Sequence, residues 1–410
     1  MSVLTLLSIN NYYYRRGGAE VVFLEQNRLL EEREWRVIPF SMVHEKNYDS
    51  EWSEYFVDEI EFGNDYSLLQ KVTNSLKVMY SFEAQKKIST LVDQVQPDIA
   101  HAHNVYHHIS PAIFNTLKSK GVPTVLTLHD LKIACPAYKM LADDGVCERC
   151  KEGSVFNVVK HKCIKGSTVL SAVVMLETMV QRLMGTYSKG VDRFVVPSRF
   201  YLEKFVEWGW PRDRFTYIPN FVDISRMTPK GSPGDYFVFF GRLGPEKGIK
   251  TLVLAAAKSG VKVKIAGTGP LEDELKELIE KTGANVELLG YRVGEELFDV
   301  IRNARAVVLP SEWYENAPIS IMEAYALERP VIGANIGGIP EMIREDETGA
   351  LFESTNVDDL SEVLTKFDRM DDETIISMGR TGRQWVELDF TVDRYIERLT
   401  ELYQELGVKC

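Results

Sequence analysis

The sequence lacks the features that mark membrane-spanning and secreted proteins. It has no run of about eighteen uncharged apolar residues, and the nearest stretch, 169–184, is interrupted by Glu177 and Arg182, so we expect no membrane-spanning helix. The first residues, MSVLTLLSIN, include no basic segment and predict a β-strand instead of a signal peptide. We therefore expect a cytoplasmic protein.

Positive charge is also scarce. The 410 residues include 60 acidic and 48 basic side chains, which gives a net charge of −12. Because nucleic-acid-binding proteins present a basic face to the phosphates, this balance argues against a nucleic-acid partner. A complete dinucleotide fingerprint is missing too. The nearest match, 267–272, has Glu272 where a small third residue is needed, and we interpret it as an ordinary turn.

Cysteines are few, and four of the five lie in one insertion: Cys135, Cys147, Cys150 and Cys163. A cytoplasmic location disfavours disulfides, and the single Cys-x-x-Cys leaves two alternatives, a structural zinc site or thiols. The same insertion is basic through Lys139, Lys151, Lys160, Lys162 and Lys165. These lysines indicate either an anionic acceptor or a peripheral contact with the inner face of the membrane, or simply a solvated loop.

The length of the chain exceeds what one hydrophobic core usually supports, so we expect two domains. Apolar runs predict strands in the first half at 4–9, 36–40, 98–103, 122–128 and 193–196, and in the second half at 236–240, 262–266, 285–289, 306–309 and 330–334. Helical patterns alternate with them. This alternation predicts an α/β fold with two doubly wound, Rossmann-like parallel sheets that face each other across a cleft. We place the domains at 1–218 and 219–385.

The stretch 306–341 carries the strongest ligand signal. A strand, a polar turn and a helix place the turn and the helix N-terminus at the carboxyl edge of a parallel sheet, where α/β proteins bind ligands. The helix N-terminus favours phosphate, and Glu315 in the turn and Glu323 in the helix can accept hydrogen bonds from hydroxyls. These features indicate a phosphorylated, hydroxyl-rich ligand such as a nucleotide sugar. The alternative is that both glutamates cap the helix or face solvent.

A second loop offers two cations. Arg242 and Lys247 follow the expected strand at 236–240, among glycines that allow close backbone approach. Together they can bind a diphosphate and stabilise it as it leaves, although a solvated charged loop is the alternative. No Asp-x-Asp pair, which holds a divalent cation in many sugar transferases, occurs anywhere. We therefore expect the two cations to neutralise the diphosphate without a metal.

The first half offers fewer candidates. Gly17 and Gly18 stand between a strand and a helix, as an anion or substrate loop would. His129 ends a strand and is our candidate for a hydrogen bond to substrate. Four further histidines cluster before it, at positions 101, 103, 107 and 108. The histidines lack the helical spacing of metal ligands, which argues against a metal site, and for these four a structural role is as good an interpretation as a substrate contact.

Taken together, these motifs resemble the retaining GT-B glycosyltransferases of family 4, in the branch that builds bacterial surface polysaccharides. The resemblance covers nearly the whole chain through Gly17-Gly18-Ala19-Glu20, Ala102-His103-Asn104, Leu128-His129-Asp130, Ile218 to Asp223, Gly241 to Gly248, and Glu315-x7-Glu323.

The resemblance implies transfer of a hexose, with retained anomeric configuration, from a nucleotide-sugar donor to a polysaccharide or lipid-linked saccharide acceptor. UDP-glucose or a related UDP-hexose is the expected donor. Charge stabilisation by Arg242 and Lys247 would be the main catalytic term. In the second domain, the resemblance implies that Arg242 and Lys247 bind the diphosphate, that Glu323 binds the ribose, and that Tyr291 and Arg292 hold the base. Glu315, with Asn316, Ala317, Pro318 and Ile319, would bind the sugar hydroxyls. In the first domain, His129 would contact the donor sugar, and Gly17 and Gly18 would lie beside the phosphates and the acceptor.

The resemblance also implies that a last helix, at 386–410, packs back on the first domain. The chain departs from the family where Phe221 replaces a glycine, and where the turn at Asn316 to Ile319 lacks one; both changes bear on sugar identity. A GT-B-fold sugar-nucleotide epimerase is the alternative enzyme. A two-domain binding protein without catalysis is a third hypothesis, and a nicotinamide dehydrogenase is the weakest because the fingerprint is missing.

Overall fold

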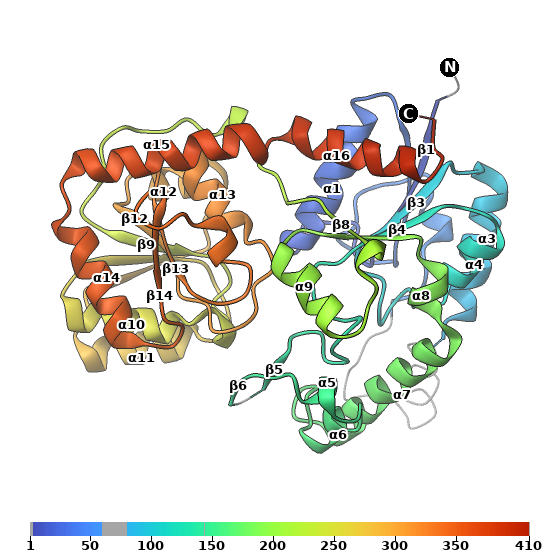
Figure 1. The fold of residues 1–410 in the computed structure, drawn as a ribbon, viewed down its shortest axis with the longest axis horizontal. Helices are drawn as coiled ribbons and strands as arrows, with labels where there is room; N and C mark the ends of the chain where they lie inside the picture. Colours follow the sequence, from blue (N-terminus) through green and yellow to red (C-terminus); the bar gives the residue numbers. More distant parts are fainter. Residues whose placement is uncertain (1–2, 60–79, 143, 410) are drawn as a thin grey trace.

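The computed structural model describes residues 3–59, 80–142 and 144–409. Figure 1 shows two lobes, each built on one parallel sheet, with a helix-rich extension below the first lobe. The chain completes the first sheet before it enters the second, and its last helix returns to the first lobe. The strands alternate with helices in both halves, as the sequence predicts.

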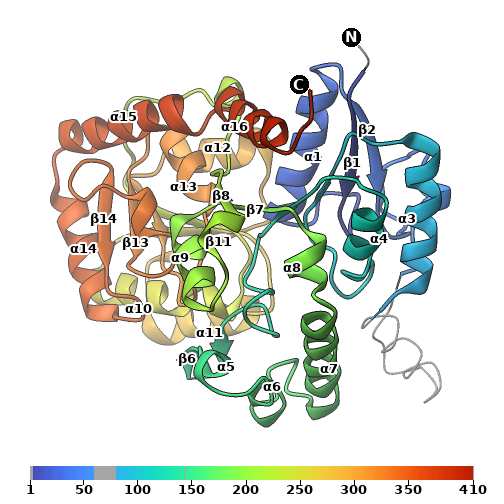
Figure 2. The same ribbon diagram turned by 45° about the vertical axis from the view of Figure 1, so that its right-hand side comes forward.

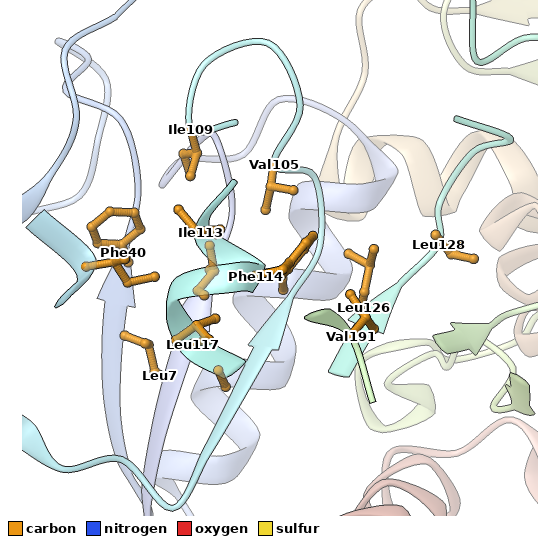
Figure 3. Packing of buried hydrophobic residues seen from close by; sticks show 14 of the residues in the cluster. Leu7, Phe40, Val105, Ile109, Ile113, Phe114, Leu117, Leu126, Leu128 and Val191 are labelled. Carbon is orange, nitrogen blue, oxygen red and sulfur yellow. The ribbon is translucent and has the colours of Figure 1, made fainter. Parts of the chain in front are cut away.

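The first sheet has six parallel strands in the order β2-β1-β3-β4-β7-β8. Their bounds are β1 Thr5–Ile9, β2 Arg36–Phe40, β3 Ile99–Ala102, β4 Thr124–Thr127, β7 Arg193–Val196 and β8 Phe215–Tyr217. Alternate side chains enter different cores. Leu7 and Leu126 pack with α3 (Phe82–Val95) and α4 (Ile113–Ser119) on one face, as Figure 3 shows in part. Leu6 and Val125 face the opposite side of the sheet, as expected for strands buried on both faces.

The second sheet repeats this plan in the order β11-β10-β9-β12-β13-β14. Its strands are β9 Phe237–Phe240, β10 Val263–Ala266, β11 Val286–Gly290, β12 Ala306–Leu309, β13 Val331–Ala334 and β14 Gly349–Phe352. Phe237 and Val308 enter one core, and Val238 and Val307 enter the other. The crossover helices are α10 Ile249–Ser259, α11 Glu272–Thr282, α12 Gly294–Arg302 and α13 Ile319–Ala326, and α14 Val357–Arg369 follows the last strand.

The remaining helices of the lobes are α1 Gly18–Glu31, α8 Thr186–Gly190, α9 Arg199–Glu207, α15 Asp372–Asp389 and α16 Val392–Glu405. Short 3-10 helices lie at Ser53–Tyr55, Arg212–Arg214, Ile224–Arg226, Pro245–Lys247 and Pro340–Met342. The structure confirms every expected strand to within two residues at each end. It adds β8 and β14 to the two sheets, which the sequence analysis did not identify.

Two chain segments cross between the lobes and pair with each other. The backbone N–H of Val222 donates to the carbonyl of Phe390 at 3.0 Å, next to a bridge between Val222 and Thr391. Beyond this crossing, α16 packs on the first lobe through buried Tyr395 and Leu399. Phe221, the residue that departs from the family's glycine, lies with its ring 4.3 Å from that of Tyr395. Here the larger side chain fills the space between the crossing and α16.

The extension below the first lobe lies between β4 and α8 (Figures 1 and 2). It contains a hairpin of β5 (Leu141–Ala142) and β6 (Gly145–Val146), and the helices α5 (Arg149–Glu152), α6 (Asn157–Lys160) and α7 (Thr168–Met184). Among the described residues, no helix combines the length and the apolar character that crossing a membrane requires.

Candidate functional site

The loop that carries Arg242 and Lys247 is shaped by glycines. Gly248 has φ +64° and lies so close to the Pro310 carbonyl oxygen that a Cβ would be 1.8 Å from it. Only glycine can therefore turn the chain from the lysine into α10 at this point. The turn after β10 supports the other side of the loop, because Leu243 N–H donates to Thr268 O at 2.9 Å. The 267–272 segment is thus a turn, as interpreted from the sequence, and one that packs on this loop.

Lys247 and Glu315 form a buried ion pair that joins the two loops singled out in the sequence. Lys247 Nζ lies 2.7 Å from Glu315 Oε1, and the hydroxyl of Ser311 donates to the same oxygen at 2.7 Å. Glu315 is only 6% exposed. Burial alone would raise the pKa of Glu315, but the charge of Lys247 and the hydrogen bonds hold it below the usual value. The carboxylate is therefore ionised at neutral pH and fixes the lysine in place.

Arg242 lies at the end of β9 with its side chain half exposed. Its guanidinium pairs with the buried carboxylate of Glu246 in the same loop. Because one edge of the fork faces Glu246, the other nitrogens of the half-exposed guanidinium can bind an anion. The two cations of the sequence prediction thus stand on one loop, each oriented by its own glutamate.

Glu323 lies in α13, one turn after the helix start. Burial raises the pKa of Glu323 to about 7. Burial is the cause of this rise, whereas Glu315 has Lys247 and Ser311 beside it. The two carboxyl groups of the Glu-x7-Glu spacing therefore differ in character, since one is a fixed charge and the other titrates near neutrality.

The turn before α13 bridges the two lobes. The amide of Asn316 donates to the Leu128 carbonyl at 3.0 Å and accepts from the Ser198 hydroxyl at 2.8 Å. The next carbonyl, that of Ala317, accepts from Asn220 at 2.9 Å. This role of the Asn316 side chain was missed in the sequence, because the partners are distant in the chain. Pro318 stands before the first helical residue with extended backbone.

The glycine loop of the first lobe lies against this same turn. Gly17 precedes α1 with extended backbone, and Gly18 is the first helical residue. A Cβ on Gly18 would lie 3.9 Å from Cδ1 of Ile319, and Ile319 packs against cores of both lobes. The structure therefore brings the Gly17-Gly18 loop and the start of α13 together from opposite lobes, so the N-termini of α1 and α13 lie close to each other.

Two further features were missed. Gly337 and Gly338 pack so closely on the backbone of Glu315 and Asn316 that a Cβ on Gly338 would be 1.9 Å from the Asn316 carbonyl oxygen. Glu341 accepts hydrogen bonds from the backbone N–H groups of Arg199, at 2.8 Å, and Phe200, at the start of α9 in the other lobe. The consecutive glycines after β13 were the available signal for the first feature. No sequence pattern predicts that a residue of one lobe caps a helix of the other lobe.

His129 follows β4 and stacks on two buried histidines. Its ring centroid is 5.1 Å from that of His103, which is 4.9 Å from that of His101, and His129 Nε2 lies 2.8 Å from His103 Nδ1. Burial lowers the pKa of His129 to about 4 and that of His101 to about 3, so both rings are neutral at pH 7. Behind them, the hydroxyl of Tyr403 in α16 is 2.6 Å from His101 Nδ1. His129 is thus a neutral ring held from behind.

Tyr291 and Arg292 stand apart from the other candidates. They follow β11, the edge strand, which two strand spacings of about 5 Å separate from β9 and the Arg242 loop. Tyr291 is 67% exposed, and Arg292 donates to the carbonyl of Tyr291 at 3.0 Å. They share the carboxyl edge of the sheet with the loop, at a distance that a nucleotide could span.

The structure does not support the zinc alternative for the insertion. In the described part of the chain, no three His, Cys, Asp or Glu side chains form a group suited to a metal ion. Cys135 and Cys163 pack against an apolar cluster that includes Val158 and Met175. Burial raises the pKa of Cys135 to about 12 and that of Cys150 to about 11, so both are neutral thiols when no metal is bound.

Two family models together match nearly the whole chain. The model described as Glycosyltransferase Family 4 matches residues 16–226, and the model described as Glycosyl transferases group 1 matches residues 223–385.

Curated relatives match at moderate identity. The putative colanic acid biosynthesis glycosyltransferase WcaL of Escherichia coli (strain K12) is 27% identical over 232 residues, which are 52% of this chain and 57% of that protein. The chain thus spans little more than half of that relative. The uncharacterized glycosyltransferase MJ1178 of Methanocaldococcus jannaschii is 27% identical over 413 residues, covering 99% of this chain and 100% of that protein.

Solved structures share the fold. A sucrose-phosphate synthase from Thermosynechococcus elongatus superposes with a TM-score of 0.70 at 18% identity, over 99% of each chain. Anabaena Alr3699/HepE in complex with UDP-glucose superposes with a TM-score of 0.66 at 15% identity, over 98% of this chain and 100% of that one. At these identities the likeness establishes the two-sheet fold alone.

Proposed function

The chain belongs to glycosyltransferase family 4 and has the GT-B fold, and from this premise we propose that it is a retaining hexosyltransferase. It would move a hexose from a nucleotide sugar to a polysaccharide or lipid-linked saccharide acceptor. The donor lobe would be residues 219–385 and the acceptor lobe residues 1–218, with 386–410 returning to the latter.

One observation carries the proposal. Two cations stand at the carboxyl edge of the second sheet, and each is held by a glutamate, Lys247 by Glu315 at 2.7 Å and Arg242 by Glu246. A cationic pair that is oriented in advance suits a group on which negative charge develops, because no reorganisation is needed when the bond breaks. The diphosphate of a nucleotide sugar is such a leaving group.

The other candidate residues fit parts of the same donor. Glu323, for which no ion pair is found among the described residues, would accept from the ribose hydroxyls, and Tyr291 with Arg292 would hold the base at the far strand. Glu315 and the backbone of Asn316 to Ile319 would face the sugar. His129, neutral at pH 7, would offer a hydrogen bond to the donor sugar from the first lobe, and Gly17 and Gly18 would lie beside the phosphates and the acceptor.

The transfer would take place on one face of the sugar. The bond from the anomeric carbon to the phosphate oxygen breaks as the bond to the acceptor oxygen forms, and the acceptor proton passes to an oxygen of the leaving diphosphate. Arg242 and Lys247 stabilise the charge on that diphosphate. A covalent role for Glu315 fits less well, because its Oε1 already accepts from Lys247 and Ser311.

The donor and acceptor classes rest on the relatives. A fold neighbour is solved with UDP-glucose, and WcaL is described as acting in colanic acid biosynthesis. We therefore propose a UDP-hexose as donor and a surface saccharide, free or lipid-linked, as acceptor. A lipid-linked acceptor would bring the protein into peripheral contact with a membrane. Arg242 and Lys247 would take the place of a metal.

The test is to incubate the purified protein with a panel of nucleotide sugars in EDTA and to measure release of nucleoside diphosphate. Release from one donor would identify the base and show that no metal is needed. A sugar-nucleotide epimerase would instead convert the donor to its epimer with no acceptor present, so product analysis separates the two enzymes. If the protein neither binds nor cleaves any donor of the panel, the proposal is contradicted.

A further inference from the structure

The outward side of α7 carries an exposed apolar stripe. Its inward face carries Val174, Met175 and Glu177, which are buried. On the opposite side, residues at helical spacing form one stripe without a charge or a polar group: Val169, Ala172, Val173, Leu176, Met179, Val180 and Leu183. Of these, Val169 is 72% exposed and Leu183 is 88% exposed.

The orientation of the helix is fixed. Glu177 forms a buried ion pair with Lys132 at 2.9 Å, with exposures of 1% and 6%. Rotating α7 to hide the stripe would pull this pair apart and leave two buried charges unpaired, which is costly. The stripe is therefore a permanent feature of the surface. A helix on the outside of a protein normally presents polar residues to water, so this face indicates a partner.

The charge around the stripe narrows the choice of partner. Residues 153–176 include three lysines, Lys160, Lys162 and Lys165, and no acidic residue, although the whole chain has a net charge of −12. All three are exposed. Lys160 also lines a surface hollow whose other residues are Glu148, Arg149, Lys151, Asn157 and His161. Figures 1 and 2 both show α6 and α7 at the lower edge of the molecule, away from the two sheets.

We propose that α7, with the lysines that precede it, docks the protein on an anionic lipid surface. An apolar stripe enters the boundary between headgroups and acyl chains, and lysines beside it bind the headgroups. A second copy of this chain fits less well, because it would bring the same lysines together. The inference deepens the proposed function, since a lipid-linked acceptor would lie at such a surface. Its evidence is the α7 face together with the lysines that precede it.

The experiment is flotation of the full chain with vesicles of phosphatidylcholine alone and with about one third phosphatidylglycerol. We expect binding to the anionic vesicles and little to the neutral ones, and weaker binding as salt is raised. Because this assay contains no nucleotide sugar, and the donor-release assay contains no vesicles, failure of one proposal is distinguishable from failure of the other.

Matched variants test the two parts of the surface. Val169→Glu with Leu183→Glu should lower the partition coefficient at least about tenfold, whereas Leu388→Glu, at a 66% exposed leucine of α15, should leave it unchanged. The substituted side chains face solvent, so thermal unfolding should match the wild type.

The lysines are tested in the same way. Replacing Lys160, Lys162 and Lys165 with Gln should lower binding to anionic vesicles at least about tenfold. The control replaces three exposed lysines of the other lobe, Lys258, Lys276 and Lys281, and should bind normally. Absence of flotation with anionic vesicles, or flotation unaffected by the α7 substitutions, would overturn the inference. A second pair of results would also overturn it: the wild type does not bind vesicles, and light scattering shows a dimer that the Leu183→Glu substitution dissociates.

Discussion

Removal of the Lys247 ammonium tests both the structure of the site and its proposed chemistry. Lys247→Ala leaves the carboxylate of Glu315 buried, at 6% exposure, without its cationic partner, while the Ser311 hydroxyl still donates to it at 2.7 Å. The same change removes one of the two cations that would stabilise the leaving diphosphate. We therefore expect two separate losses, one in the free energy of unfolding and one in turnover.

The size of each loss follows from the geometry. Breaking a fully buried pair costs roughly 3–5 kcal/mol, but Lys247 is 23% exposed, so water can partly replace it and we expect about 2–3 kcal/mol. In a lobe of this size that corresponds to a fall in Tm of about 5–10 °C. Loss of one transition-state donor lowers turnover by about 10²-fold or more.

The assays are thermal unfolding and release of nucleoside diphosphate, at a temperature where the variant is folded. Lys250→Ala is the matched control, because this lysine lies three residues away and pairs at 2.5 Å with Glu274, both half exposed. An exposed pair contributes at most about 1 kcal/mol, and Lys250 is not among the residues assigned to the donor. We expect near-normal stability and turnover for it.

A double variant separates the two losses. In Lys247→Ala with Glu315→Gln, the buried group is neutral, so at least half of the lost stability should return while turnover stays low. Turnover of the folded Lys247→Ala protein within about threefold of the wild type would refute the assignment of Lys247 to the leaving group. Unchanged stability of the same variant would refute the buried ion pair.

Three other predictions concern the remaining parts of the site. Burial raises the pKa of Glu323 to about 7 from the usual 4.5. As the pH rises from 4.5, the Glu323 carboxyl ionises in the unfolded chain before it ionises in the native protein, so the native state loses stability. The stability gained by Glu323→Gln over the wild type should therefore grow by about 1–3 kcal/mol between pH 4.5 and 7 and then level off, as measured by denaturant unfolding. His129 has a pKa lowered to about 4, so its protonation should cause no step in turnover at saturating donor between pH 5.5 and 8, and His129→Gln should lower turnover without altering that profile. Asn316→Ala removes the bridge to the Leu128 carbonyl and should lower kcat/KM about tenfold while changing the free energy of unfolding by only about 1 kcal/mol, whereas an unchanged kcat/KM would contradict a role for the bridge.

The sequence predicted what depends on local pattern. Buried strands such as Arg36–Phe40 and Ala306–Leu309 appeared with their full bounds, because short apolar runs between turns are a local signal. The Arg242 and Lys247 loop was predicted by its place after a strand. That Lys247 pairs with Glu315 was not predicted, because the two residues are 68 positions apart and no periodicity links residues on different loops.

Other parts of the site depend on the arrangement of the lobes and left little trace in the sequence. Glu341 ends the stretch, 306–341, in which the sequence predicts ligand binding, yet its carboxylate caps α9 of the other lobe. The zinc alternative for the cysteines rested on spacing alone. Spacing does not reveal that Cys135 lies against an apolar cluster, where a neutral thiol is the favoured form.

The contacts between the lobes fall into two kinds that respond differently to separation. On the side of the candidate site, partly buried Ile319 packs against cores of both lobes, and Asn316 and Glu341 bind backbone groups of the first lobe. Water can replace such hydrogen bonds at a net cost of about 1 kcal/mol each. At the crossing, buried Tyr395 and Leu399 of α16 pack on the first lobe, and exposing them would cost more because apolar area cannot be satisfied by water. The crossing therefore holds the lobes together more strongly, whereas water can replace the polar contacts beside the candidate site. A ligand that contacts both lobes at the candidate site would add its binding energy to these polar contacts. A few kcal/mol there are enough to shift the equilibrium between closed and open lobes.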